Sequence, residues 1–171
     1  MDIPSHLNGY ETLYEQDPRT ASLQWFQDAK FGLFVHYALA SLFPHGKPEL
    51  LELVADAPHL MNVMEAAPEE LAGMDMSEAD REQCLAIKQD LMNRFTAEQF
   101  DADAICDLAE AAQMRYVTFT TKHLMGLFMY KNSITEYASI NTAAGRDLVA
   151  EMVQACQKRG VGYFHYVPPE F

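Results

Sequence analysis

The fold is decided by three stretches near the end of the sequence: YVTFTTKH (Tyr116–His123), NTAAGRDLVAEMVQACQKRG (Asn141–Gly160) and VGYFHYV (Val161–Val167). The first and the last are short, apolar and rich in β-branched and aromatic residues, which is typical of buried strands. The middle stretch has apolar residues at helical spacing and ends in a glycine, which is typical of a helix. A strand, a helix and a second strand in this order favour parallel pairing with a right-handed crossover.

An earlier apolar run, FGLFVHY (Phe31–Tyr37), predicts a first strand of the same kind. Its continuous apolar character suits a parallel sheet that is covered on both faces. Helices are expected around the strands, because capping residues adjoin stretches with helical spacing. The expected helices are Ala21–Ala29 after Thr20, Glu78–Met92 after Ser77, Ala102–Gln113 after Asp101, and Asp147–Lys158 before Gly160.

Two finer expectations concern the region before the second strand. Thr96 followed by Gln99 repeats the capping-box signal. In the helix expected after Asp101, apolar residues form a stripe at the spacing i, i+3, i+4, i+7. The stripe consists of Ile105, Leu108, Ala109 and Ala112.

The order of these elements predicts the fold class α/β, with about three parallel strands and helices that look like an incomplete (β/α)8, TIM-barrel-like fold. A complete barrel needs about 250 residues, whereas the chain has 171. We expect residues 1–171 to form a single partial catalytic-barrel domain. Residues 38–76 are expected to be an irregular insertion with helical turns at Glu49–Val54 and Pro58–Glu65, which either covers a site or is degenerate.

Composition excludes several classes of partner. The net charge of −13 argues against nucleic acid and anionic membranes, because phosphate binding needs clustered Lys and Arg. No apolar run approaches the roughly 20 residues that cross a bilayer. The start of the sequence lacks the basic and apolar regions of a signal peptide, so the expected compartment is the cytoplasm.

The cysteines do not indicate a disulfide framework or a zinc knot. There are three of them, and none forms a CxxC pair. Cys106 and Cys156 fall on apolar helix faces, so they are expected to be buried thiols.

Polar residues gather where the expected strands end. His36 and Tyr37 end the first, Lys122 and His123 the second, and His165 and Tyr166 the third. The carboxyl ends of parallel strands meet at one edge of a sheet, where barrel sites are built. This arrangement predicts a polar pocket, although any one of the histidines could instead be a hydrogen-bonded structural residue.

Other chemistries fit the strand ends less well. Three histidines can hold zinc, but these lack a short HxH or HxxxH spacing and have no carboxylate nearby, so we expect no metal site. There is no GxSxG, P-loop or GxGxxG motif, and no cysteine lies at a strand end. No cofactor is expected. Lys122 is the weaker candidate of its pair, because it could as easily form an ion pair with a nearby acid.

The sequence resembles the family 29 glycoside hydrolases, the α-L-fucosidases, whose first strand reads much like WFxxAKFGxFxHWG. The resemblance covers about two thirds of the chain, in the order of the family. It rests on WFQDAKFGLFVH (Trp25–His36), RFTAEQFDAD (Arg94–Asp103), LAEAAQMRYV (Leu108–Val117), TKH (Thr121–His123), NTAAGRDLV (Asn141–Val149) and CQKRG (Cys156–Gly160).

The resemblance implies a retaining hydrolase of terminal α-L-fucose, acting on a fucosylated glycan or fucoside, with a β-sandwich behind the barrel. It places the catalytic nucleophile and the acid/base carboxylate on later strands, so we expect no catalytic residue within these 171 residues. His36 and His123 match the sugar-binding pattern of the family, and Tyr166 matches a tyrosine at the end of the third strand. These three are the expected substrate-binding residues.

The sequence also departs from the family pattern. Leu124 and Met125 stand where the family has a second His and an Asp, and Tyr37 and Tyr130 replace tryptophans. Apolar side chains in place of His and Asp remove hydrogen bonds from a site that grips hydroxyl groups, which could cost several kcal/mol of binding.

Three hypotheses follow. The chain is the amino-terminal part of a fucosidase-like enzyme and is inactive alone, or it is a non-catalytic carbohydrate-binding or assembly module, or it is a degenerate remnant. In the first two cases, the partner expected at the open barrel edge is the remaining half of the barrel or a second copy of the chain.

Overall fold

The computed structural model describes residues 2–43, 47–64, 66–123 and 125–167. Their contacts divide the chain into two compact units. The first consists of residues 1–36, 100–119 and 149–166, and the second of residues 37–99, 120–148 and 167–171. The expectation of a single partial domain over residues 1–171 stays a prediction.

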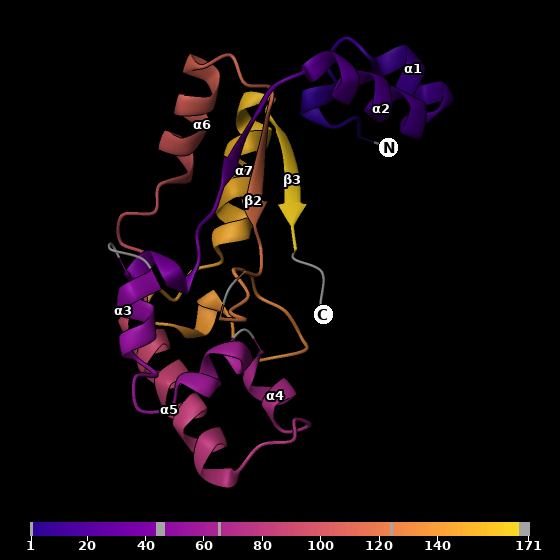
Figure 1. Ribbon diagram of the computed structural model, residues 1–171. Coiled ribbons are helices and arrows are strands. Elements are labelled where there is room, and N and C mark those ends of the chain that lie inside the picture. Colours follow the sequence, from indigo (N-terminus) through magenta and orange to yellow (C-terminus); the bar gives the residue numbers. More distant parts are fainter. Residues whose placement is uncertain (1, 44–46, 65, 124, 168–171) are drawn as a thin grey trace. The chain divides into compact units, whose positions relative to one another are not determined.

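The first unit is built on a sheet of three strands in the order β1-β2-β3 (Figure 1). The strands are β1 (Gly32–Val35), β2 (Tyr116–Thr120) and β3 (Gly162–Tyr166). β1 and β3 are shorter than predicted at both ends, and β2 at its carboxyl end only. β1 pairs with β2 in parallel, with Gly32 opposite Tyr116 and Val35 opposite Phe119. The helices of this unit are η1 (Ser5–Leu7), α1 (Glu11–Gln16), α2 (Pro18–Ala29), α6 (Ala102–Ala111) and α7 (Leu148–Arg159).

Two glycines at the starts of strands make room for aromatic rings. A Cβ atom on Gly32 would meet the Tyr116 ring at 2.1 Å, and one on Gly162 would meet the Trp25 ring at 2.3 Å. Trp25 is 2% exposed and belongs to a core cluster with Leu7 and Ala29. Helix α2 can therefore lie against the amino-terminal end of the sheet (Figure 1).

The start of α2 corrects the expected cap at Thr20. The helix begins at Pro18, and the Asp17 side chain accepts hydrogen bonds from the backbone N–H groups of Arg19 and Thr20 at 3.0 and 3.2 Å. Proline suits the first helical position because the N–H that it lacks would have no partner there. The pair Asp17–Pro18 was thus the stronger start signal.

Helices α6 and α7 pack beside the sheet and were largely foreseen. Asp101 caps α6 by accepting from Ala104 N at 3.0 Å, and Gly160 follows α7 with φ +68°, as expected of a C′ glycine. Of the predicted stripe on α6, Ala109 is buried as expected, but the placement of Leu108 was wrong, because it is 60% exposed. The buried residues of that helix are Ala102, Cys106 and Ala109.

The second unit contains the expected insertion and the segment that follows β2. The elements are η2 (Leu39–Leu42), α3 (Lys47–Glu52), η3 (Pro58–Val63), α4 (Pro68–Leu71), α5 (Glu78–Arg94) and η4 (Ser139–Asn141). Short, irregular helical turns over residues 38–76 agree with the sequence, except that α4 was not predicted. Helices α4 and α5 are in contact, and both can be followed in Figure 1.

Ser77 caps α5 by accepting from Asp80 N at 3.1 Å, as predicted. The capping-box expectation at Thr96 was wrong, because no helix forms there and Ala97 has φ +47°. The Ala97 carbonyl instead accepts a hydrogen bond from Arg146 Nη1 at 2.8 Å. A long-range contact therefore replaced a local signal.

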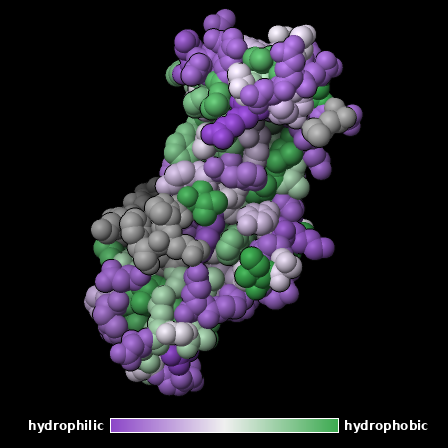
Figure 2. All heavy atoms as spheres, turned by 90° about the vertical axis from the view of Figure 1, so that its right-hand side faces the viewer, coloured by the Kyte–Doolittle hydropathy of each residue, from purple (hydrophilic) through white to green (hydrophobic). Residues whose placement is uncertain are grey.

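Hydrophobic side chains remain at the surface of the first unit. Phe26, Phe31, Phe34 and Phe164 are between 37% and 55% exposed. On the face drawn in Figure 2, hydrophobic residues form separate patches between hydrophilic ones. Among the helices in the described ranges, none is both long and apolar enough to cross a membrane.

Candidate functional site

Two of the three predicted site residues meet at the carboxyl edge of the sheet. His36 directly follows β1, and Tyr166 is the last residue of β3. Their ring centroids are 5.8 Å apart, and the Phe34 ring lies 4.3 Å from the first and 5.1 Å from the second. Phe34 and His36 share a face because strand side chains alternate. Thr118, opposite Phe34 on β2, has a short side chain over which these rings can meet.

His165 does not join this group. Its ring lies 4.9 Å from that of Tyr163 in an edge-on arrangement. Residues 163 and 165 lie on the face of the strand opposite to residues 164 and 166. The histidine that the sequence showed at the third strand end is therefore excluded from the aromatic face.

His123, the third predicted residue, lies in the second unit, three residues beyond the end of β2. Its side chain is half-buried. Its part in a site with His36 and Tyr166 stays a prediction. Leu124, which replaces the second family histidine, lies outside the described residues. Met125 is described and is 1% exposed.

Lys122 forms the ion pair that the sequence left open. Its Nζ lies 3.6 Å from Oε1 of Glu70 on α4 and 5.2 Å from the centroid of the Phe128 ring. The lysine side chain is 9% exposed, and the glutamate side chain is 41% exposed. The same helix reaches the segment after β2 a second time, because Thr135 Oγ1 donates to Glu69 Oε1 at 2.5 Å. The insertion therefore supplies carboxylates to the loop that carries His123.

Lys88 on α5 is a buried ammonium that sequence reasoning missed. It is 1% exposed, and its Nζ donates to the carbonyl oxygens of Met64 at 2.7 Å and Met125 at 3.2 Å. The Tyr137 ring centroid lies 5.2 Å from the nitrogen. Burial lowers the pKa of Lys88 to about 8. The one signal in the sequence was its spacing from Cys84 and Leu91, which places it on the buried face of the helix.

The segment after β1 is fixed to the end of β2 by Thr120. Tyr37 N donates to Thr120 Oγ1 at 2.9 Å, and the same hydroxyl lies 2.9 Å from the Tyr37 carbonyl oxygen, to which it can donate. Burial raises the pKa of the Tyr37 phenol. Tyr37 thus keeps a defined place where the family has tryptophan.

The donor set suits recognition of a neutral polyhydroxylated ligand. Imidazole and phenol groups can hydrogen-bond hydroxyl groups, and aromatic rings can pack against the apolar face of a sugar. Within the described ranges, no group of three or more His, Cys, Asp or Glu residues is arranged to hold a metal ion. Among the described residues that end the strands, none is a carboxylate.

Comparisons with a family model and with known sequences point to the same family. A sequence model described as Alpha-L-fucosidase matches residues 3–168. Tissue alpha-L-fucosidase of Bos taurus is 33% identical over 143 residues, which are 83% of this chain and 28% of the relative. Alpha-L-fucosidase of Dictyostelium discoideum is 26% identical over 145 residues, which are 82% of this chain and 30% of the relative. The chain thus spans less than a third of the length of these relatives.

Solved structures agree in fold. Alpha-L-fucosidase isoenzyme 1 of Paenibacillus thiaminolyticus superimposes with a TM-score of 0.58 and 28% identity, over 84% of this chain and 28% of that one. Alpha-L-fucosidase AlfC of Lactobacillus casei, solved with alpha-L-fucose product, gives a TM-score of 0.58 and 26% identity, over 84% of this chain and 39% of that one. The expected fold class is confirmed: three parallel strands with helices, similar to the amino-terminal part of these barrels.

Proposed function

Because the chain belongs to the alpha-L-fucosidase family, we propose that residues 1–171 act as the amino-terminal part of a fucosidase barrel, which binds terminal α-L-fucose but does not complete hydrolysis by itself. The observation that carries the proposal is the meeting of His36 and Tyr166 at the carboxyl edge of the sheet. Barrel enzymes build their sites at that edge. His123, in the second unit, is proposed separately as a further sugar-binding residue.

Hydrolysis with retention requires two carboxyl groups about 5 to 5.5 Å apart, one as nucleophile and one as acid and base. By resemblance, the family places both on later strands. In the proposed division of labour, this chain orients the sugar and excludes water from one side of it. Its imidazole and phenol groups then hydrogen-bond hydroxyl groups of the fucose ring.

The substitutions near His123 predict weak binding. Leu124 and Met125 cannot make the hydrogen bonds of a His–Asp pair. Each neutral hydrogen bond contributes about 0.5–1.5 kcal/mol, so two lost bonds weaken affinity roughly 5- to 150-fold. We therefore expect a dissociation constant in the millimolar range for free fucose.

A non-catalytic assembly module is the second candidate function, and a specific observation favours it. The sheet has β1 and β3 as its two edge strands, and Phe34 and Phe164 on its face are 49% and 37% exposed. The remaining half of a barrel, or a second copy of this chain, would cover such a surface. We also propose the cytoplasm as the compartment of the protein.

The test is binding of L-fucose to the 171-residue chain, measured by saturation-transfer NMR. D-fucose is the matched control, because the enantiomer has the same size and polarity. We expect saturation transfer to L-fucose alone, and its loss in His36→Ala. Equal transfer to both enantiomers, or none to either, would contradict the proposal. His59→Ala is the control variant, because this side chain is 64% exposed and pairs with Asp80 on α5.

A further inference from the structure

A pair of cysteines joins the two helices of the first unit. Cys106 of α6 and Cys156 of α7 have their Sγ atoms 3.6 Å apart, in van der Waals and weak hydrogen-bond contact. Both residues are 0% exposed. The third cysteine, Cys84, lies on α5 in the second unit.

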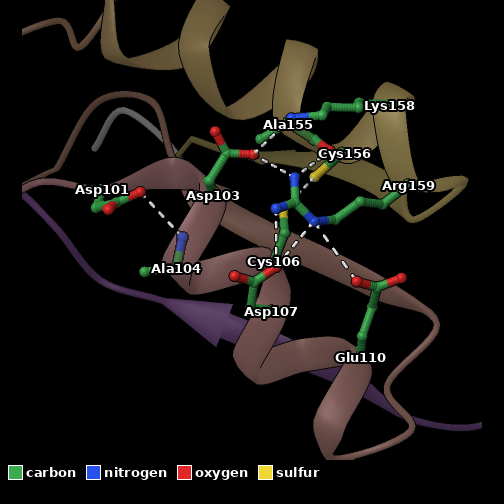
Figure 3. A network of polar contacts seen from close by, with 10 residues as sticks. All are labelled: Asp101, Asp103, Ala104, Cys106, Asp107, Glu110, Ala155, Cys156, Lys158 and Arg159. Atoms are coloured by element: carbon green, nitrogen blue, oxygen red, sulfur yellow. Dashed lines mark hydrogen bonds and ion pairs between the residues drawn. The ribbon is translucent and has the colours of Figure 1, made fainter.

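An arginine holds the same two helices together beside the thiols (Figure 3). Arg159, three residues after Cys156, directs its guanidinium at acids on α6. Its Nη2 lies 2.8 Å from Asp107 Oδ1, its Nε lies 3.5 Å from Glu110 Oε2, and its Nη1 pairs with Asp103. The helices are therefore fixed at the position where the sulfur atoms meet.

We propose that Cys106 and Cys156 are a disulfide site, which a low-molecular-weight disulfide such as oxidised glutathione converts from two thiols to a bond between α6 and α7. A disulfide has its sulfur atoms about 2.05 Å apart, so the atoms must approach by roughly 1.5 Å. This inference does not depend on sugar binding.

The chemistry is an ordinary exchange. The Cys106 thiolate attacks one sulfur of oxidised glutathione and releases one glutathione thiolate. The Cys156 thiolate then attacks the Cys106 sulfur of the mixed disulfide and releases the second. The two protein thiols are oxidised, the oxidant is reduced to two glutathione molecules, and the two thiol protons pass to them.

The surroundings favour Cys106 as the attacking thiol. The hydrogen bond between the two thiols lowers the pKa of Cys106, and the Arg159 guanidinium lowers it further. The same hydrogen bond, together with burial, raises the pKa of Cys156. Because both thiols are fully buried, the oxidant reaches them only when α6 and α7 separate transiently or before the chain has folded.

The bond would constrain the part of the chain that carries His123. Cys106 and Cys156 are 50 positions apart, and the ring that they close includes β2 and the segment after it. Closing a loop of this length restricts the unfolded chain and stabilises the folded one. We expect the melting temperature of the oxidised protein to exceed that of the reduced protein by roughly 5–15 °C.

The experiment is refolding of the 171-residue chain from urea in glutathione buffers of stated ratio, so that burial does not limit access. After alkylation and tryptic digestion, Cys106 should leave in Phe95–Arg115 and Cys156 in Asp147–Lys158. The oxidised sample should contain these two peptides joined, with Cys84 alkylated in Glu82–Lys88. The reduced sample should show all three cysteines alkylated.

Two variants complete the test. Cys84→Ser should keep the joined peptides and the gain in melting temperature, whereas Cys156→Ser should lose both. Three alkylated cysteines in oxidising buffer, glutathione retained on Cys106, or a bond that includes Cys84 would each overturn the proposal. A joined pair that lowers the melting temperature would equally overturn it, because the native geometry would then oppose the bond. The wild-type peptide map decides the question even if a variant fails to fold.

Discussion

The His36 imidazole and the Tyr166 ring lie 5.8 Å apart, centroid to centroid, although β1 and β3 are separated by β2 in the sheet. Phe34 fills the space beside both rings. Because Thr118 on β2 has a small side chain, aromatic rings at the ends of β1 and β3 can form one surface across it.

Replacing Tyr166 by alanine should weaken L-fucose binding by about 5- to 10-fold, because the ring supplies packing area and the hydroxyl supplies a hydrogen bond. Tyr166→Phe should lose about 3-fold, since it keeps the ring. His165→Ala is the matched control, because that neighbour faces the opposite side of the strand. NMR titration with L-fucose measures all three. Equal losses in Tyr166→Ala and His165→Ala would exclude a site on this face.

The 171-residue chain should not hydrolyse an aryl α-L-fucoside above the uncatalysed rate. Retention requires two suitably spaced carboxyl groups, and the described strand ends carry none. Release of the aryl group is followed by absorbance over hours at micromolar protein. Hydrolysis that disappears in His123→Ala would show that the chain is catalytic by itself.

Arg159→Met should lower the melting temperature by roughly 2–5 °C at pH 7, because it leaves Asp103, Asp107 and Glu110 without their shared cation. The hydrogen bond from Arg159 holds the pKa of Asp103 below 3.8. A carboxylate with a lowered folded pKa stabilises the fold above its unfolded pKa, and this contribution is lost as pH falls through the folded value. The difference between wild type and variant should therefore close below about pH 4.

Lys158→Met is the control for that prediction. Lys158 Nζ lies 3.7 Å from the same Asp103, but its side chain is 71% exposed, so solvent screens the pair. We expect a melting temperature within about 1 °C of wild type. Equal effects of the two substitutions would mean that the guanidinium does not hold α6 and α7 together.

Lys88→Met should change how stability depends on alkaline pH. The pKa of Lys88 is lowered from 10.5 to about 8, so between these values the folded chain releases a proton that the unfolded chain retains. The free energy of unfolding of wild type should therefore rise relative to the variant from pH 8 to 10.5, by about 3 kcal/mol over the window. Urea unfolding at several pH values measures it. Lys131→Met is the control, because Lys131 is exposed. A difference in unfolding free energy between wild type and Lys88→Met that does not change with pH would contradict a lowered pKa of Lys88.

The fold was predictable where its signals are local. Asp101 and Gly160 mark the ends of α6 and α7 through backbone geometry that neighbours alone determine, and both were correct. Thr96 gave the same kind of local signal, but the prediction was wrong. The Ala97 carbonyl there accepts a hydrogen bond from Arg146, which lies far along the chain. On α6, the prediction that Cys106 is buried was correct, whereas periodicity wrongly favoured Leu108, which is 60% exposed.

In the candidate site, too, some residues could be predicted from the sequence and others could not. His36 and Tyr166 could be found because strand ends and strand alternation follow from the sequence. Glu70 and Lys88 could not, because their roles depend on contacts of α4 and α5 with the segment after β2. A lysine within an apolar stripe is ambiguous in sequence, and only the carbonyl oxygens of Met64 and Met125 resolve it.

Association is the last property that the open sheet predicts. The described strands form a sheet of three, so the outer edges of β1 and β3 have backbone groups that no further described strand pairs. Phe34 on the sheet face is 49% exposed. Unpaired edges and exposed aromatic rings favour association between chains. We therefore expect sedimentation at low micromolar concentration to show oligomers or aggregates.

A pair of matched variants distinguishes association through the sheet face from nonspecific association. Phe34→Glu places a charge on the sheet face and should shift the distribution toward monomer, because burying an unpaired carboxylate in an interface is costly. Leu108→Glu adds the same charge at a side chain on α6 that is 60% exposed, and should leave the distribution unchanged. A wild-type chain that is monomeric, unfolds cooperatively and melts at high temperature would mean that its own residues cover the sheet. If only Leu108→Glu gave monomers, the interface would lie on α6 and not on the sheet face.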